Sequence, residues 1–189
     1  MIKGTKTEKN LLKAFAGESQ ARTRYTKFAS VARKEGFEQI ANLFIETANN
    51  EYEHATLFFN HLEGGPVEIT ATYPAGKVGT TLENLAQAAN GEQEEHAVLY
   101  PEFAKVAREE GFNDIANLFE KIATIERNHE IRYRKLYDNV RTNKVFQKDI
   151  PQIWQCLECG YQVEGTAAPE ICPVCSHPQS FYQLKCENY

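Results

Sequence analysis

Hydrophobic residues recur every three or four positions along four stretches of this 189-residue chain, which is the period of an α-helix. Two of the stretches open with the spacing of a helix N-terminal capping box, at Thr5 and at Thr80. Residues 64–79 contain glycine, proline and β-branched residues without this period, so they predict a long crossover. The pattern predicts a mainly α four-helix bundle, with helices over residues 5–36, 37–63, 80–111 and 112–141.

The two halves of the helical region are repeats of each other. Val31–Phe37 recurs with one exchange as Val106–Phe112, and Ile40–Phe44 recurs unchanged as Ile115–Phe119. The offset is the same in both cases, so that Val31 corresponds to Val106 and Ile40 to Ile115. Equivalent positions in the two halves can therefore be compared directly.

A Glu-x-x-His pattern occurs once in each half, at Glu51 and His54 and again at Glu126 and His129. The offset of the repeat carries the first pair onto the second. Residues three apart on a helix point the same way, and all four lie on apolar stripes where core residues belong. Carboxylate with imidazole is a ligand set that suits iron or manganese.

Two further acidic residues, Glu18 and Glu92, also occupy apolar stripes, where an unpaired charge is costly to bury. The repeat offset carries Glu18 onto Gln93, one residue away from Glu92. Since a proline distorts the helical turn before it, we expect a π-bulge or kink between Glu92 and Pro101 that returns Glu92 to the inner face. Lone acids on long helices usually face solvent, but acids repeated at core positions predict a dinuclear metal site with six ligands: Glu18, Glu51, His54, Glu92, Glu126 and His129.

The remaining acids and histidines fit this pattern less well. Glu95 lies one turn after Glu92 in an acidic run, and the repeat leaves two interpretations of it equally open, a ligand or a solvent-facing residue. We expect His61 and His96 to be surface or partly buried residues. His177 lies outside the spacing of the cysteine pairs and is not assigned as a ligand.

The net charge of −5 and a sequence pI of about 5.6 argue against a nucleic-acid-binding surface. No apolar run is long enough to span a bilayer, and the N-terminus lacks the apolar core of a signal peptide. We therefore expect a cytoplasmic protein. Four of the five cysteines form two Cys-x-x-Cys pairs, which in a reducing compartment indicate metal ligands before disulfides.

Helical periodicity stops after Arg141, and the rest of the chain is short and rich in cysteine, proline and aromatic residues. Such a short segment can bury only a small hydrophobic core, so we expect a bound metal to stabilise its fold. Its predicted ligands are the thiolates Cys156, Cys159, Cys172 and Cys175. Tetrahedral sulfur ligation suits zinc and iron equally, so the spacing does not choose between them. Cys186 is expected to be a free thiol, and the predicted domains are residues 1–144 and 145–189.

The chain resembles the rubrerythrins over essentially its whole length. The resemblance rests on Ala14–Arg22, on both Glu-x-x-His motifs, and on the cysteine-containing segments 156–161 and 172–175. It implies a ferritin-like four-helix bundle with one long crossover, followed by a small rubredoxin-like metal-binding domain. The cofactors that it implies are a non-haem di-iron site in the bundle and one iron in the four-cysteine site.

The resemblance also implies a role for each residue of the dinuclear site. Glu51 and Glu126 bridge the two irons, Glu18 binds the first iron, and Glu92 and His129 bind the second.

Further roles come from the resemblance alone. When its redox state changes, the first iron exchanges Glu95 for His54, which selects the ligand interpretation of Glu95. Tyr25 and Tyr100 donate hydrogen bonds to ligand carboxylates.

The activity that the resemblance implies is reduction of hydrogen peroxide to water, a protection against oxidative stress. Electrons come from NAD(P)H through a separate reductase or a rubredoxin, and then through the four-cysteine iron. Two alternatives remain from the residues themselves. A ferroxidase or iron-handling protein shares the bundle but does not need the cysteine-rich tail, and a structural bundle with a zinc-ribbon interaction module holds zinc without iron.

The predicted place of the tail favours a head-to-tail homodimer. His129 lies about 13 residues before the end of its helix, which is roughly 20 Å along the helix axis. Residues 143–153 are a short linker, so the tail begins far from the dinuclear site of its own chain. A two-fold neighbour can place its tail beside the middle of the bundle instead. The resemblance implies the same arrangement.

Overall fold

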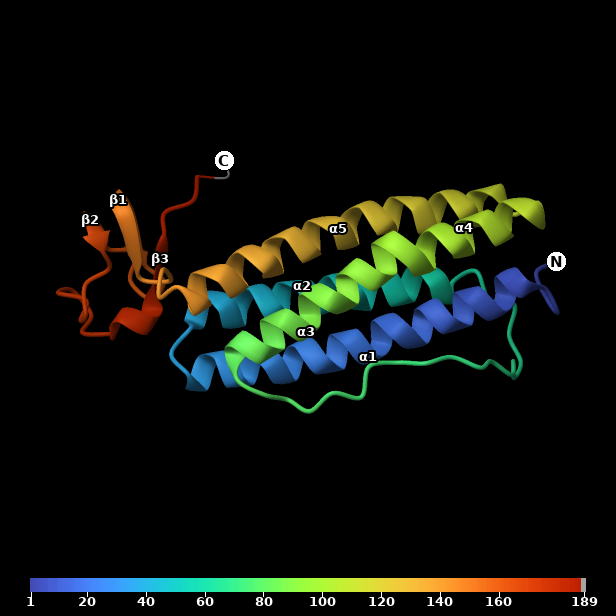
Figure 1. Cartoon of the computed structure of the whole chain (residues 1–189), viewed down its shortest axis with the longest axis horizontal. Coiled ribbons are helices and arrows are strands. Elements are labelled where there is room, and N and C mark those ends of the chain that lie inside the picture. Colours follow the sequence, from blue (N-terminus) through green and yellow to red (C-terminus); the bar gives the residue numbers. More distant parts are fainter. Residues whose placement is uncertain (188–189) are drawn as a thin grey trace.

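The structure is a computed structural model that describes residues 1–187. The last two residues of the predicted C-terminal domain, 188 and 189, lie outside the described residues. Figure 1 shows a long helical bundle with a small β-domain at one end. The helices of the bundle are α1 (Lys6–Lys34), α2 (Glu38–Phe59), α3 (Thr81–Glu94), the π-helix η1 (Glu95–Leu99), α4 (Tyr100–Glu109) and α5 (Asn113–Arg141).

The bundle contains four helical rods, because α3, η1 and α4 follow one another without a break. Helix α1 packs against α2, and α5 packs against α3 and α4. The crossover between α2 and α3 runs back along the length of α1 (Figure 1). This arrangement confirms the predicted mainly α bundle with one long crossover. Within residues 1–187, no helix combines the length and the apolar character that a membrane span requires.

The predicted irregularity in the third rod is a π-helix over Glu95–Leu99. It lies between Glu92 and Pro101, as the one-residue slip of the repeat requires. A π-turn accommodates one extra residue, so Glu92 returns to the inner face and is fully buried. The prediction is confirmed.

The helix ends follow the local sequence with two differences. Thr80 and Glu83 form the predicted capping box at α3. At α1 the Thr5 hydroxyl accepts a hydrogen bond from the Glu8 amide, as in a capping box. The Glu8 carboxylate, however, accepts from the amide of Gly4 rather than from that of Thr5. Helix α2 ends at Phe59 instead of near residue 63, because the amides of His61 and Leu62 bond to carbonyl oxygens only three residues back.

Each helical hairpin turns at a glycine. Gly36 and Gly111 have φ of +84° and +86°, a conformation that L side chains rarely adopt. The amides of Phe37 and Phe112 then bond to carbonyl oxygens five residues earlier, each at 2.8 Å. The two turns are equivalent in the repeat, so both pairs of antiparallel helices close in the same way.

The apolar core is divided by a polar layer. On α2 the order is Phe44, Glu51, Phe58, with Phe44 in one hydrophobic cluster and Phe58 in the other. The same alternation of cluster, acid and cluster recurs along α1 and α5. The buried acids are therefore enclosed by apolar packing on both sides along the bundle axis.

The C-terminal part contains β1 (Gln147–Cys156), β2 (Gln162–Ala167), the short helix η2 (Gln179–Phe181) and β3 (Tyr182–Leu184), with β1 in the middle of an antiparallel sheet. Trp154 of β1 is fully buried, and its indole N–H donates to the carbonyl oxygen of Gly165 at 3.0 Å. The rings of Phe37 and Phe146 stack with centroids 6.1 Å apart, which joins this part to the end of the bundle.

Candidate metal centres

The four rods bring the six predicted ligands of the dinuclear site together at mid-bundle. One group of side chains whose ligand atoms all lie within 4.8 Å of one another contains Glu18, Glu51, His54 and Glu126, and a second contains Glu51, Glu92, Glu126 and His129. Glu51 and Glu126 belong to both groups, and we call them the shared carboxylates. All six side chains are buried.

Each shared carboxylate turns one oxygen to each histidine. His54 Nδ1 lies 2.8 Å from Glu51 Oε2 and 2.8 Å from Glu126 Oε1. His129 Nδ1 lies 2.7 Å from Glu126 Oε2 and 3.3 Å from Glu51 Oε1. This is the placement that two carboxylates need if each is to link two cations.

The donor atoms of this cluster fit a metal pair. Both oxygens of each shared carboxylate and the Nδ1 atoms of both histidines are buried without a properly oriented hydrogen bond. One oxygen of Glu18 and one of Glu92 are likewise buried without a hydrogen bond. Buried polar atoms are normally paired, so eight such atoms converging on one point indicate cations as their partners.

Burial and mutual charge set the protonation of the cluster. Burial and then the charge of Glu126 raise the pKa of Glu18 well above its usual range, and burial and the other shared carboxylate do the same for Glu92. Burial lowers the pKa of His54, but contact with the shared carboxylates overrides this and raises it to about 10. The same causes raise the pKa of His129 to about 12. The protein groups alone thus hold extra protons, which divalent cations can replace.

Both predicted tyrosines donate to ligand candidates. The Tyr25 hydroxyl donates to Glu92 Oε1 at 2.5 Å, and the Tyr100 hydroxyl donates to Glu18 Oε1. Both side chains are almost completely buried. Each tyrosine therefore fixes the orientation of one terminal carboxylate.

Glu95 lies beside the two groups and is a member of neither. Its Oε1 is 4.0 Å from the place that a Cβ would take on Gly17. Burial and then the charge of Glu92 raise the pKa of Glu95 well above its usual range. In this structure His54, and not Glu95, completes the first group.

A cavity of about 400 Å³ lies between α1, the crossover and the π-turn. Its wall includes Glu95, both tyrosines and Gly17. The crossover contributes Tyr73, whose hydroxyl donates to the carbonyl oxygen of Lys13 at 2.8 Å. A small molecule can therefore approach the cluster from the side of Glu95.

Sequence reasoning missed Gly17 and Tyr73. A glycine inside a long helix costs about 1 kcal/mol relative to alanine, and that cost was a usable signal for Gly17. Its lack of a side chain leaves room in the cavity wall, where a Cβ would stand 3.6 Å from the Tyr73 ring. Nothing in the aperiodic crossover distinguishes Tyr73.

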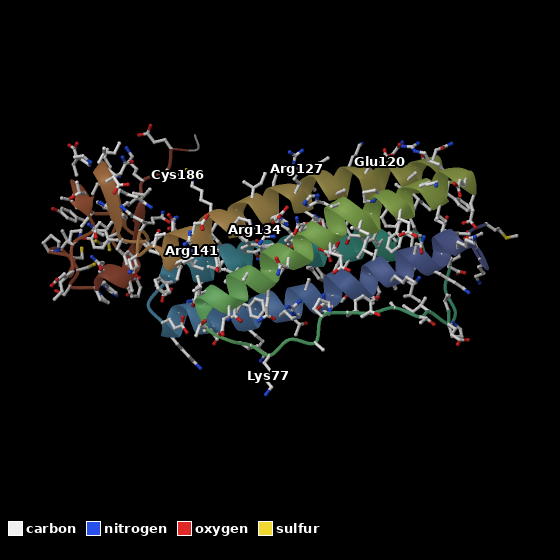
Figure 2. All side chains as sticks on the ribbon, in the orientation of Figure 1. Lys77, Glu120, Arg127, Arg134, Arg141 and Cys186 are labelled. Atoms are coloured by element: carbon white, nitrogen blue, oxygen red, sulfur yellow. The ribbon has the colours of Figure 1, made fainter. Side chains whose placement is uncertain are left out.

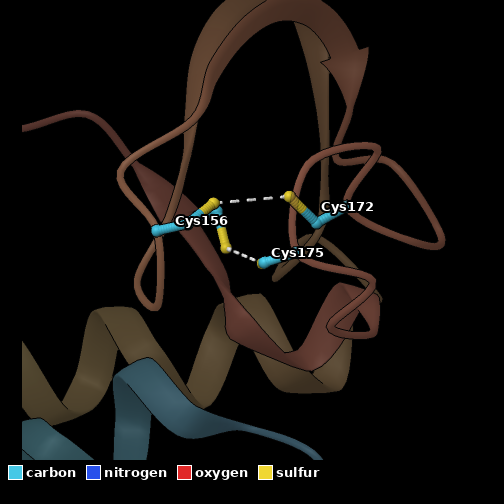
Figure 3. Close-up of side chains that lie close together, drawn as sticks. Cys156, Cys172 and Cys175 are labelled. Carbon is cyan, nitrogen blue, oxygen red and sulfur yellow. Dashed lines mark hydrogen bonds between the residues drawn. The ribbon is translucent and has the colours of Figure 1, made fainter.

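The four cysteines of the tail converge as predicted. Cys156 Sγ lies 3.7 Å from Cys175 Sγ, and Cys159 Sγ lies 3.6 Å from Cys172 Sγ (Figure 3). All four sulfur atoms lie within 4.8 Å of one another. A metal–sulfur bond of about 2.3 Å gives a tetrahedron with edges of about 3.8 Å, so the spacing fits one tetrahedral ion.

Two matching turns hold these sulfurs. The Cys156 amide bonds to the Tyr161 carbonyl and the Cys172 amide to the His177 carbonyl, both at 2.8 Å. The turns contain positive φ angles, 77° at Gly160 and 60° at Ser176.

Nearby donors favour the thiolate form at Cys172. Burial raises its pKa, but the backbone amide of Cys175, the Tyr182 hydroxyl and the amide of Val174 lower it to about 6. Donors of this kind stabilise thiolate charge and tune a redox potential.

Known proteins similar to this chain match it along its whole length. The family profile described as Rubrerythrin matches residues 9–137, and the profile described as Rubrerythrin, rubredoxin-like domain matches residues 154–183. The chain is 56% identical to the rubrerythrin of Porphyromonas gingivalis, with 100% of this chain and 94% of the relative covered. It is 52% identical to rubrerythrin-1 of Clostridium acetobutylicum, with 100% and 98% covered. It also matches the structure of nigerythrin in its fully reduced, all-ferrous state, with a TM-score of 0.64, 33% identity, and 98% and 92% covered.

Proposed function

The chain belongs to the rubrerythrin family, with a di-iron site of carboxylate and histidine ligands and a four-cysteine rubredoxin-like site. We propose that it reduces hydrogen peroxide to water. The observation that carries the proposal is the pair of shared carboxylates, each turned to both histidines, beside a cavity open to a small molecule. The second support is the four-cysteine site on the same chain, because an electron-transfer centre suits repeated turnover.

The ligand roles are part of this proposal. Glu51 and Glu126, which belong to both groups, would be shared by the two irons, while Glu18 and His54 would hold the first and Glu92 and His129 the second. Bound as a reduced pair, the irons supply both electrons that cleavage of the O–O bond consumes. The protein contributes position and electrostatics to this chemistry.

Protons and orientation come from the chain. Reduction of one peroxide to two waters consumes two electrons and two protons. Glu95 lines the cavity and has a raised pKa, so its carboxyl group is placed to give a proton to the departing oxygen. By the resemblance to the family, Glu95 would also take the place of His54 as a ligand when the redox state changes. Tyr25 and Tyr100 hold the terminal carboxylates still during this exchange.

In this proposal the four cysteines would hold one iron, and this site would receive electrons from an NAD(P)H-linked reductase or a rubredoxin. We propose that the tail, residues 145–189, is a separate domain from residues 1–144. Its described part, residues 145–187, lies beyond the C-terminal end of α5, away from mid-bundle (Figure 1). A head-to-tail homodimer brings each tail beside the other chain's di-iron site. The proposed place of action is the cytoplasm, where cysteines stay reduced; none of the five forms a disulfide in this structure.

The test uses purified protein loaded with ferrous iron and analysed for both iron and zinc. We expect peroxide to be consumed with oxidation of NADH when a reductase is supplied, and Glu126→Ala to abolish this while the colour of the four-cysteine iron persists. Cys156→Ser with Cys159→Ser should stop steady turnover but leave a single turnover by chemically reduced protein. Faster oxidation of ferrous iron by dioxygen than by peroxide, with mineral formation, would instead identify an iron-handling protein.

A further inference from the structure

A polar network on the outside of the bundle links the π-turn and the end of α3 to α5. His96 Nε2 donates to Glu130 Oε2 at 2.7 Å, and Arg134 Nε donates to the other oxygen, Oε1, at 3.1 Å. Arg134 also donates to Gln93 Oε1 at 3.1 Å, from the side of α5 that faces α3 (Figure 2). The Glu130 side chain is 15% exposed and the His96 side chain 18% exposed, so their contact is partly shielded from water, whereas the Arg134 side chain is 42% exposed.

Two residues of the network, Gln93 and His96, lie on either side of Glu95 in the sequence. Gln93 is the second-last residue of α3, and His96 is the second residue of the π-turn. Both are tied to α5 on one side of the rod. Glu95, between them, faces the opposite way, toward Gly17 of α1 and the cavity.

The internal repeat shows that this network is specific to the irregular rod. At the offset that carries Glu51 onto Glu126, Glu130 corresponds to Ala55 and Arg134 to Phe59. Neither Ala55 nor Phe59 can accept or donate a hydrogen bond through its side chain. The rod that packs on Ala55 and Phe59 is α1, an uninterrupted α-helix over Lys6–Lys34. The polar network, which we also call the anchor, therefore occurs in the half of the repeat that contains the π-turn.

A π-helical segment is rare and occurs mostly as a single turn inside an α-helix, frequently at a functional site. We propose that His96 is a positioning residue, which through Glu130 fixes the backbone of the π-turn so that the Glu95 carboxylate is presented to the metal pair. The backbone stays in place while the Glu95 side chain moves. His96 itself does not line the cavity.

Hydrogen–deuterium exchange tests the anchor without any enzymatic activity. His96→Ala should accelerate exchange of the amides in Glu95–Tyr100 by about tenfold, whereas His96→Gln, whose amide nitrogen can take the place of Nε2, should restore slow exchange. His61→Ala removes a histidine from an exposed position and is the matched control. If His96→Ala does not fold, Gln93→Ala, which removes one outer hydrogen bond, must give a smaller acceleration in the same amides.

The functional consequence rests on the proposed peroxidase and is measured separately. In iron-loaded protein, His96→Ala should lower kcat about tenfold, or 1.4 kcal/mol, with KM for peroxide within about twofold, and His96→Gln should recover kcat. The visible absorption of the oxidised bundle iron should shift in His96→Ala, because Glu95 is less well placed. Unchanged exchange in the π-turn of folded His96→Ala overturns the anchor. A wild-type protein without peroxidase activity removes the proposed function instead, and leaves the exchange result to decide the anchor.

Discussion

The hydroxyl of Tyr25 on α1 donates to Glu92 on α3 at 2.5 Å, across the interface between the two halves of the repeat. The equivalent tyrosine in the second half, Tyr100, donates in the opposite sense to Glu18 on α1. Each half thus orients the terminal carboxylate of the other half. This reciprocal pairing makes the metal site depend on the correct assembly of both helical hairpins.

Replacing Tyr25 with phenylalanine removes one donor from a buried carboxylate. A hydrogen bond to a charged group contributes about 1.5–3 kcal/mol, so we expect the free energy of unfolding of metal-loaded Tyr25→Phe to fall by that amount. Urea denaturation measures it, with Tyr52→Phe as control because the Tyr52 residue is 53% exposed. A loss no greater than in the control would show that the hydrogen bond does not stabilise the loaded site.

The size of residue 17 should control access of peroxide. A Cβ at Gly17 would meet the Tyr73 ring at 3.6 Å, an ordinary contact, so Gly17→Ala should keep KM near that of the wild type. The larger side chain of Gly17→Leu fills the cavity beside Glu95 and should raise KM for peroxide about tenfold, equivalent to about 1.4 kcal/mol. Steady-state kinetics at varied peroxide provides the measurement, and equal KM values for both variants would rule out this route.

The metal-free protein should lose stability as pH rises. The pKa values of His54 and His129 are raised to about 10 and about 12, above the value of about 6.5 in an unfolded chain. Their contribution is complete below about pH 6.5 and is lost as pH rises through the folded-state values. The raised pKa values of Glu18 and Glu92 act in the same direction.

We therefore expect the urea midpoint of metal-free protein to be lower at pH 9 than at pH 6, because at pH 9 the folded site must keep protons that the unfolded chain has already released. The metal-loaded protein should show a smaller fall, since the cations hold the ligands in their deprotonated forms. A midpoint of the metal-free protein that stays level or increases between these pH values would contradict the assigned protonation.

Mixed dimers test whether electrons cross between chains. One chain carries Glu126→Ala, and the other lacks the thiols of Cys156 and Cys159. If each tail serves the other chain, the mixed dimer joins an intact tail to an intact di-iron site, so NADH-driven peroxidase activity should return after subunit exchange. Mixed dimers that form and remain inactive would place the transfer within one chain.

Much of the fold follows from the sequence because the determinants are local and repeated. The apolar period fixes the rods, and the constant offset of the repeat exposes the extra residue that becomes the π-turn at Glu95–Leu99. The six buried ligand candidates stand out because acids and histidines on apolar stripes interrupt the hydrophobic pattern of the helices. The cysteine spacing likewise predicts the tetrahedral cluster in the tail.

Other features depend on contacts between distant segments and carry no periodic signal. Tyr73 lies in an aperiodic crossover, and only the packing of that segment on α1 places it at the cavity. His96 and Glu130 look like ordinary surface residues until α3 and α5 are brought together. The end of α2 at Phe59 depends on a local competition between helix and turn that residues 60–63 do not reveal.

In the proposed mechanism, peroxide takes electrons from the four-cysteine iron only through the bundle. The direct measurement is stopped-flow mixing of fully reduced, iron-loaded protein with peroxide, following the visible absorption of the four-cysteine iron as it is oxidised. Wild-type protein should oxidise this iron at a rate that rises with peroxide concentration, and Glu126→Ala, with the same tail, should do so more than about 100-fold more slowly. Equal rates in the two proteins would mean that the tail reacts with peroxide on its own, which contradicts the claim.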